Sequence, residues 1–299
     1  MIATLNCRLR GICAHREGVL AKCAQGIFLK VLSVESVRSF GKRIWFLALM
    51  GTFFFKLPIC TAENEVSSAA AFEDRSRQVF QAARDQFKAN PKAEEAAVKF
   101  GQAAFDWADF TKESAERERI ALEGIAACRQ AIASAPKSAA AHYYLAMNLG
   151  QLAQTKRLGA LRLVNEMETE FHLARNLDER LDFAGPDRNL GLLYAEAPGW
   201  PTSIGNRSKA RQHLQRAVIL FPNYPEGRIN LLEAYLKWSD QTGAQRELKA
   251  LDELLPLAKK EFSGERWEPS WIDWEKRWKK IQTKASELEK NLESPRNKK

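Results

Sequence analysis

The stretch LQRAVILFPNYPEGRINLLEAYL, residues 214–236, decides the fold of this 299-residue chain. It predicts a helix, a turn at Pro222 and a second helix, with small and large apolar residues at fixed offsets in both. Ala217 lies five residues before that proline, and Leu231 and Tyr235 share one face of the second helix. A small residue in a helix contact determines how closely two helices approach. The stretch therefore predicts a closely packed pair of helices.

The same spacing recurs in three earlier stretches of the chain. From residue 72 on, apolar residues follow helical spacing, and the alternation typical of a strand is not sustained anywhere. A recurring helix pair predicts a solenoid, because each pair leaves an apolar face that its neighbour covers. The predicted units are residues 93–136, 139–178, 184–222 and 225–256. The recurring packing positions are held by Leu145, Ala146, Ala174, Gly191, Tyr194, Ala217, Pro222, Leu231 and Tyr235.

On these residues, the region 93–256 resembles the tetratricopeptide repeat (TPR), a helix pair of about 34 residues. The resemblance implies an all-α, right-handed α-solenoid of about four TPR-like hairpins. It also implies a non-enzymatic scaffold or adaptor that binds a protein partner or an extended ligand on a helical surface.

The segments that flank the repeats are predicted to cover the two ends of the array within a helical domain at 72–292. Residues 72–90 supply an N-terminal helix, and Asn90 before Pro91 predicts the start of the next helix. A C-terminal capping helix is predicted at 269–292, with one apolar face that carries Trp271, Trp274 and Trp278. Alternatively, an exposed tryptophan face would be an interface with a partner or a second copy. Residues 63–71 are predicted to be a short tether and 293–299 a disordered tail.

The first 62 residues differ in charge from the rest of the chain. They hold nine Lys/Arg against two acids, so most of the net charge of +9 lies there and the remainder is nearly neutral. No nucleic-acid partner is therefore expected. A basic pair, an apolar segment at 44–55 and small residues up to Ala62 predict a secretory signal peptide cleaved after Ala62. This places the protein in the periplasm or envelope. A retained leader or acylation at Cys60 would instead attach it to a membrane.

Few residues in the mature region suggest chemistry. Its histidines stand singly, without the spacing of a metal site or a general base, and Cys128 occupies a core position. No phosphate-binding glycine loop is present. The sequence therefore predicts no catalytic residue, no metal and no cofactor, and the protein is not expected to be an enzyme. An enzyme or a binder of a small apolar ligand, with a site that the sequence does not reveal, remains the alternative.

The loop AEAPGWPTSIG, residues 195–205, holds the main candidates for a partner or ligand surface. Trp200 is a large aromatic residue on a connector stiffened by prolines, and connectors of solenoids often line a binding face. The alternative is that Trp200 folds underneath and fills the gap between two helices. The predicted surface comprises Trp200, Pro201, Ile204 and, on a repeat helix, His142.

Two stretches carry a finer resemblance. GALRLVNEMETEFHLARNLD (159–178) and PDRNLGLLYAEAPGWP (186–201) are similar to exported bacterial T-component proteins associated with TRAP transporters. They are more distantly similar to regulator-of-microtubule-dynamics proteins. The first resemblance implies a periplasmic solute-binding or transporter subunit as the partner.

Overall fold

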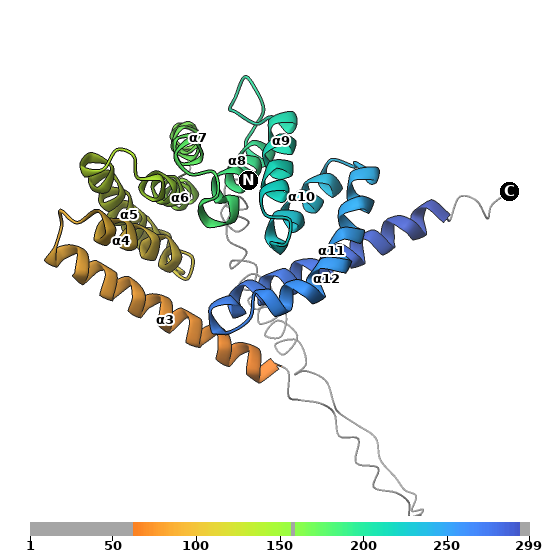
Figure 1. Ribbon diagram of the computed structural model, residues 1–299, viewed down its shortest axis with the longest axis horizontal. Helices are drawn as coiled ribbons and strands as arrows, with labels where there is room; N and C mark the ends of the chain where they lie inside the picture. The colour runs from red at the N-terminus through yellow and green to blue at the C-terminus, as the bar shows by residue number, and fades with distance from the viewer. Residues whose placement is uncertain (1–61, 157–158, 294–299) are drawn as a thin grey trace, which may run out of the picture. The chain divides into compact units, whose positions relative to one another are not determined.

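A computed structural model describes residues 62–156 and 159–293 (Figure 1). Within these ranges the chain forms ten α-helices and one 3-10 helix, which confirms the predicted all-α class. Residues from Glu73 on belong to one compact unit, and 62–72 belong to another. The predicted signal peptide and the tail residues 294–299 lie outside the described residues. In the described ranges no helix is both long and apolar enough to cross a membrane.

Eight of the helices form four consecutive antiparallel pairs, and each pair packs against the next (Figure 1). The pairs are α4 (Glu94–Ala108) with α5 (Ser114–Ser134), α6 (Ala139–Thr155) with α7 (Ala160–Leu177), α8 (Leu181–Glu196) with α9 (Arg207–Leu220), and α10 (Pro225–Lys237) with α11 (Gln241–Glu261).

The core lies along the seams between these helices. Ala146, Ala174 and Ala217 are buried where neighbouring helices meet, and the larger residues of the repeat pattern, such as Leu145 and Tyr235, pack beside them. Pro222, in contrast, is exposed at the turn before α10. Small side chains therefore lie at the helix contacts, as close approach of two helices requires.

The two segments that flank the repeats are also helical. The predicted tether at 63–71 is wrong, because α3 spans Ala62–Ala89. These residues are mainly Ala, Ser and Glu without Gly or Pro, so they continue a helix at little cost. The prediction that Asn90 starts α4 is also wrong. The Asn90 N–H donates to Gln86 O and ends α3, and α4 begins at Glu94.

Helix α12 (Glu268–Glu293) follows the 3-10 helix η1 (Glu265–Trp267) and packs against α10. Trp274 is 1% exposed, and Trp271 and Trp278 are half-buried against the core. The indole of Trp271 donates from Nε1 to Phe262 O over 2.6 Å. The tryptophan face is therefore packed against the rest of the molecule, and the alternative of an exposed aromatic patch is wrong.

Pro186 and Pro256 lie inside α8 and α11. Pro186 follows residues 182–184, which have left-handed φ values of 49° to 57°, so it begins the right-handed part of α8. A proline in a first turn removes no hydrogen bond. Pro256 lies on the exposed side of α11, where water can bond the carbonyl of Asp252.

Candidate functional site

The loop between α8 and α9 is braced by its own backbone. Gly205 N donates to Pro198 O over 2.8 Å, and Asn206 N donates to Tyr194 O over 3.0 Å. A Cβ on Gly205 would lie 2.2 Å from Ala197 O, so only glycine fits there. The Asn206 side chain caps α9 by accepting from Lys209 N. These contacts tie the two ends of the loop to each other and to the end of α8.

Trp200 projects from this loop and is 89% exposed. The alternative in which Trp200 fills the gap between two helices is therefore wrong. Pro201 beside it is exposed, whereas Ile204 is half-buried and packs against the core. Ile204 thus attaches the loop to the core, and the aromatic ring of Trp200 is exposed to solvent.

His142 does not join this surface. It lies on α6 and is 6% exposed. Its Nδ1 is 2.5 Å from Glu170 Oε2, and its Nε2 is 3.1 Å from Pro136 O. Both ring nitrogens therefore have partners inside the protein, and His142 links α6 to α7 and to the turn before α6. The structure brings together Trp200, Pro201 and Ile204 of the four candidates.

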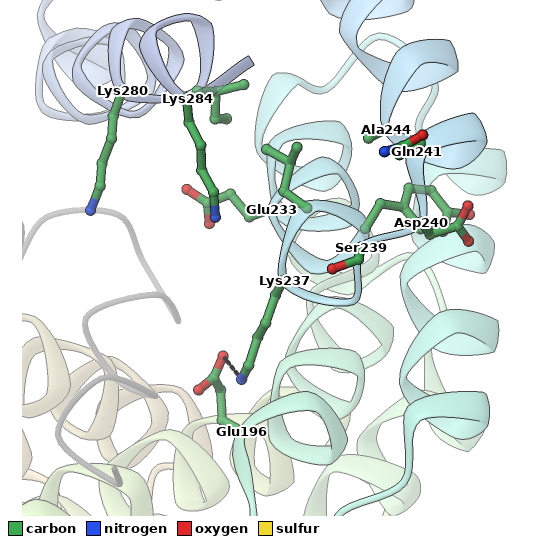
Figure 2. Close-up of a pocket in the computed structure, with 12 residues that line it drawn as sticks. Glu196, Glu233, Lys237, Ser239, Asp240, Gln241, Ala244, Lys280 and Lys284 are labelled. Carbon is green, nitrogen blue, oxygen red and sulfur yellow. Dashed lines mark ion pairs between the residues drawn. The ribbon is translucent and has the colours of Figure 1, made fainter. Parts of the chain in front are cut away.

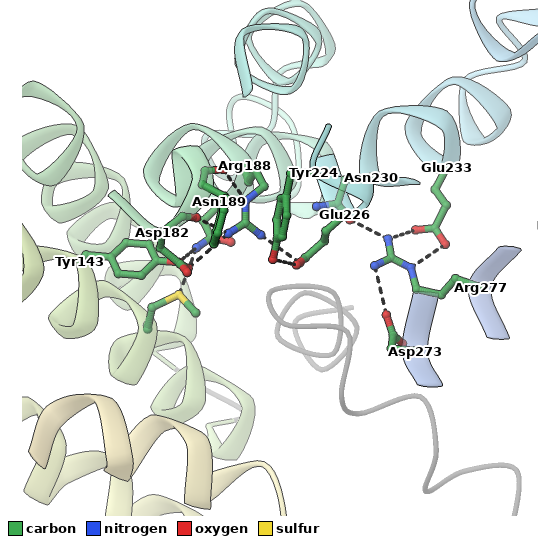
Figure 3. Close-up of polar contacts among 12 residues, drawn as sticks. Tyr143, Asp182, Arg188, Asn189, Tyr224, Glu226, Asn230, Glu233, Asp273 and Arg277 are labelled. Carbon is green, nitrogen blue, oxygen red and sulfur yellow. Dashed lines mark hydrogen bonds and ion pairs between the residues drawn. The ribbon is translucent and has the colours of Figure 1, made fainter. Parts of the chain in front are cut away.

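A buried polar network that the sequence did not reveal lies along α6, α8 and α10 (Figure 3). Asp182, Phe183 and Ala184 form a left-handed turn at the start of α8. The guanidinium of Arg188 donates to Asp182 O over 2.7 Å and to Phe183 O over 3.1 Å. Tyr143 Oη on α6 donates to Asp182 Oδ2 over 2.7 Å. Arg188 and Tyr143 therefore stabilise a turn that non-glycine residues seldom adopt.

Arg188 also joins α8 to the next pair. Its Nη1 is 3.0 Å from Glu226 Oε1 on α10, and Tyr224 Oη donates to Glu226 Oε2 over 3.1 Å. Burial alone would lower the pKa of Arg188, but the charges of Glu226 and Asp182 outweigh it and raise that pKa. Burial and the Glu226 charge raise the pKa of Tyr224. Both groups thus keep their protons, and the network is an interlock between successive repeats.

A second polar cluster fixes α12 to α10. Arg277 donates from Nη2 to Asn230 Oδ1 over 2.6 Å and to Glu233 Oε2 over 2.9 Å, and its Nη1 is 3.4 Å from Asp273 Oδ2 (Figure 3). Burial raises the pKa of Asp273 to about 7, although Arg277 opposes that shift. The docking of α12 therefore includes a carboxyl group that titrates near neutral pH.

Two histidines lie close together on α7 and α9, which are the second helices of their pairs. The rings of His172 on α7 and His213 on α9 lie 5.7 Å apart beside a groove of about 610 Å³. Burial and the neighbouring His213 lower the pKa of His172. His213 and Arg175 bind the carboxylate of Asp187, which is 0% exposed. In the described ranges no group of three or more His, Cys, Asp or Glu is arranged to hold a metal ion.

The four consecutive helix pairs, each packed against the next, define the chain as a TPR-like helical repeat protein. The family model described as regulator of microtubule dynamics protein 1-3 matches residues 64–177. A thermophilic TPR protein from Thermus thermophilus has a similar fold, with a TM-score of 0.52 and 17% sequence identity over 74% of this chain and 96% of that one. No curated protein matches the sequence. The resemblance to T-component proteins stays a prediction.

Proposed function

We propose that this protein is a non-enzymatic scaffold that binds a protein partner, with Trp200 as the anchoring side chain. The observation that carries the proposal is the 89% exposure of an indole on a braced loop. Tryptophan is enriched among the residues that contribute most to protein interfaces. A loop that is already ordered loses little conformational entropy when it binds. Trp200 therefore combines a large apolar area with a low ordering cost.

The fold supports the same proposal. Each helix pair contacts its neighbours in sequence, and repeat arrays of this kind offer extended surfaces for partners. The family whose model matches residues 64–177 is named for regulating microtubule dynamics, a role that binding to other proteins can serve. For this chain the name supports partner binding as the mode of action.

We also propose that the partner belongs to the cell envelope. The order of charge, apolar segment and small residues before Ala62 supports export, and the family match starts at residue 64, just after the proposed cleavage position. The resemblance to T-component proteins supports a solute-binding or transporter subunit. Amino-terminal sequencing of the protein from its own cells tests the location. A first residue at or near Glu63 supports export, and an intact leader contradicts cleavage.

Quantitative capture tests the binding proposal. The full chain with a carboxy-terminal tag is purified from its own cells as wild type, Trp200→Ala and Leu257→Ala. Leu257 is 64% exposed on α11 and serves as a matched control for loss of exposed apolar surface. We expect wild type and Leu257→Ala to enrich one protein, either a different partner or an untagged copy of this chain. Trp200→Ala should recover at least about tenfold less of that protein. Equal recovery with all three would refute the role of Trp200.

A further inference from the structure

A cavity of about 710 Å³ lies between α12 and the carboxyl ends of α8 and α10 (Figure 2). Apolar side chains from Tyr235, Leu236, Ala244 and Ile281 form part of its wall. Tyr235, Ala244 and Ile281 are buried, so this part of the wall belongs to the core. The cavity thus has an apolar floor that is built into the fold.

Charged side chains surround that floor, and each acid among them already has a basic partner. Glu196 binds Lys237 at 3.0 Å, Asp240 binds Arg211 at 2.7 Å, and Glu233 binds Arg277 at 2.9 Å. These pairs offset most of the negative charge of the wall, although Arg277 is shared between Glu233 and Asp273.

Two lysines of α12 that line the cavity are not among these ion pairs. Lys280 and Lys284 are one helical turn apart, both line the cavity, and Figure 2 shows both extending from α12, with Lys284 on the side toward Glu233. Within the described residues neither lysine takes part in an ion pair. The cavity wall therefore carries two lysine side chains without an acidic partner among the described residues, which favours an anionic occupant.

The cavity is open along one side. Lys237, Ser239, Gln241, Lys280 and Lys284 all line it and are all exposed. Pockets for small ligands usually bury most of the ligand surface, so this open shape fits a segment of a larger molecule better. Ser239 has a φ of 57°, and a non-glycine residue held in that conformation often marks a functional position.

We propose that this cavity binds an acidic, partly apolar segment of a partner protein in an extended conformation. Alternate residues of an extended chain are roughly 6.6 Å apart, close to the spacing of side chains one helical turn apart. Two acidic side chains on one edge of the segment would pair with Lys280 and Lys284. The intervening apolar side chain, which points to the opposite face of the extended segment, would contact Leu236 on α10.

A labelled peptide tests this directly. The probe is a fluorescein-labelled heptapeptide of alternating glutamate and leucine, and its binding to the full chain is followed by fluorescence anisotropy. We expect saturable binding that weakens when salt rises from about 50 to 500 mM, since screening reduces exposed charge interactions. The same peptide with glutamine in place of glutamate should bind at least about tenfold more weakly.

Variants of α12 locate the site. Lys280→Glu combined with Lys284→Glu should weaken binding of the acidic peptide at least about tenfold. Lys279→Glu changes the same charge at an exposed residue of α12 that does not line the cavity, and it should leave binding within about twofold. All three lysines are exposed, so unchanged melting curves should show that the variants fold.

Three outcomes would overturn the proposal: no binding to wild type, equal binding of the glutamine peptide, or equal loss with Lys279→Glu. Binding of sodium laurate that depends on Lys280 and Lys284, without peptide binding, would instead assign the cavity to a small amphipathic anion. The inference rests on the proposed scaffold function. The two can fail separately, because the peptide assay does not involve Trp200 and the capture experiment does not alter α12.

Discussion

Gly191 on α8 faces Leu214 on α9 so closely that a Cβ on the glycine would lie 2.6 Å from Leu214 Cγ. It would also lie 3.1 Å from Leu214 N, so moving the leucine side chain alone would not make enough room. This glycine therefore sets the separation of the third helix pair.

Gly191→Ala should destabilise the fold by about 1–3 kcal/mol, because the added methyl group overpacks the contact. The matched control is Gly227→Ala on α10, where a Cβ would meet nothing closer than Val218 Cγ2 at 3.8 Å. That change should stabilise the protein by up to about 1 kcal/mol through helix propensity. Denaturant unfolding of both variants measures the difference. If Gly191→Ala were the more stable of the two, the predicted close contact would be absent.

Arg188→Met should lower the free energy of unfolding by about 3–5 kcal/mol, because Glu226 would stay buried without its cationic partner. The carbonyls of the left-handed turn would lose their donor as well. Arg180→Met is a suitable control, since the exposed Arg180 side chain contacts only the ring of Phe221 among the interactions described, and its backbone bond to Asp178 is unaffected. A loss below about 1 kcal/mol for Arg188→Met would show that the interlock does not hold successive repeats together.

Asp273 should make stability depend on pH. Its pKa is raised from 3.8 to about 7 in the folded protein by burial, so the folded state binds the proton more tightly than the unfolded state. The stabilisation that comes from protonated Asp273 is complete below the pKa of this residue in the unfolded chain, and it is lost as pH rises to about 7. Compared with wild type, Asp273→Asn should therefore become more stable as pH increases from about 4 to 8, by roughly 4 kcal/mol, the amount that a pKa raised from 3.8 to about 7 represents.

Melting curves between pH of about 4 and 8 measure this effect, with Asp252→Asn as the control. Asp252 is exposed on α11, so its replacement should shift stability by less than about 0.5 kcal/mol at any pH. A constant difference between Asp273→Asn and wild type across this range would exclude a titration of Asp273 that is linked to folding.

The features predicted correctly from the sequence are those determined by local pattern. Helical spacing revealed the all-α class, because the apolar residues recur every three or four positions along each helix. The burial of Ala217 followed from recurrence along the chain. Each of these features depends on residues close together in the sequence.

The features that the sequence missed depend on partners far apart in the chain. The left-handed turn at 182–184 contains no glycine, and Arg188, Tyr143 and Glu226 around it come from three helices. Whether Trp200 turns inward or outward depends on packing under the loop, where Ile204 contacts the core and Trp200 does not. His142 appeared as a candidate surface residue because its partner Glu170 lies on the next helix. No local pattern could identify these contacts.

The most direct test of a scaffold that binds through Trp200 is photo-crosslinking in the protein's own cells. Trp200 is replaced by the photoreactive residue p-benzoylphenylalanine, with the same replacement at Leu257 as the control, and adducts are identified by mass spectrometry. Both positions are exposed, at 89% and 64%, so the two proteins should fold alike. The scaffold proposal predicts a discrete adduct with one protein from position 200 and none with that protein from position 257. No adduct at position 200, or the same adducts from both positions, would contradict it.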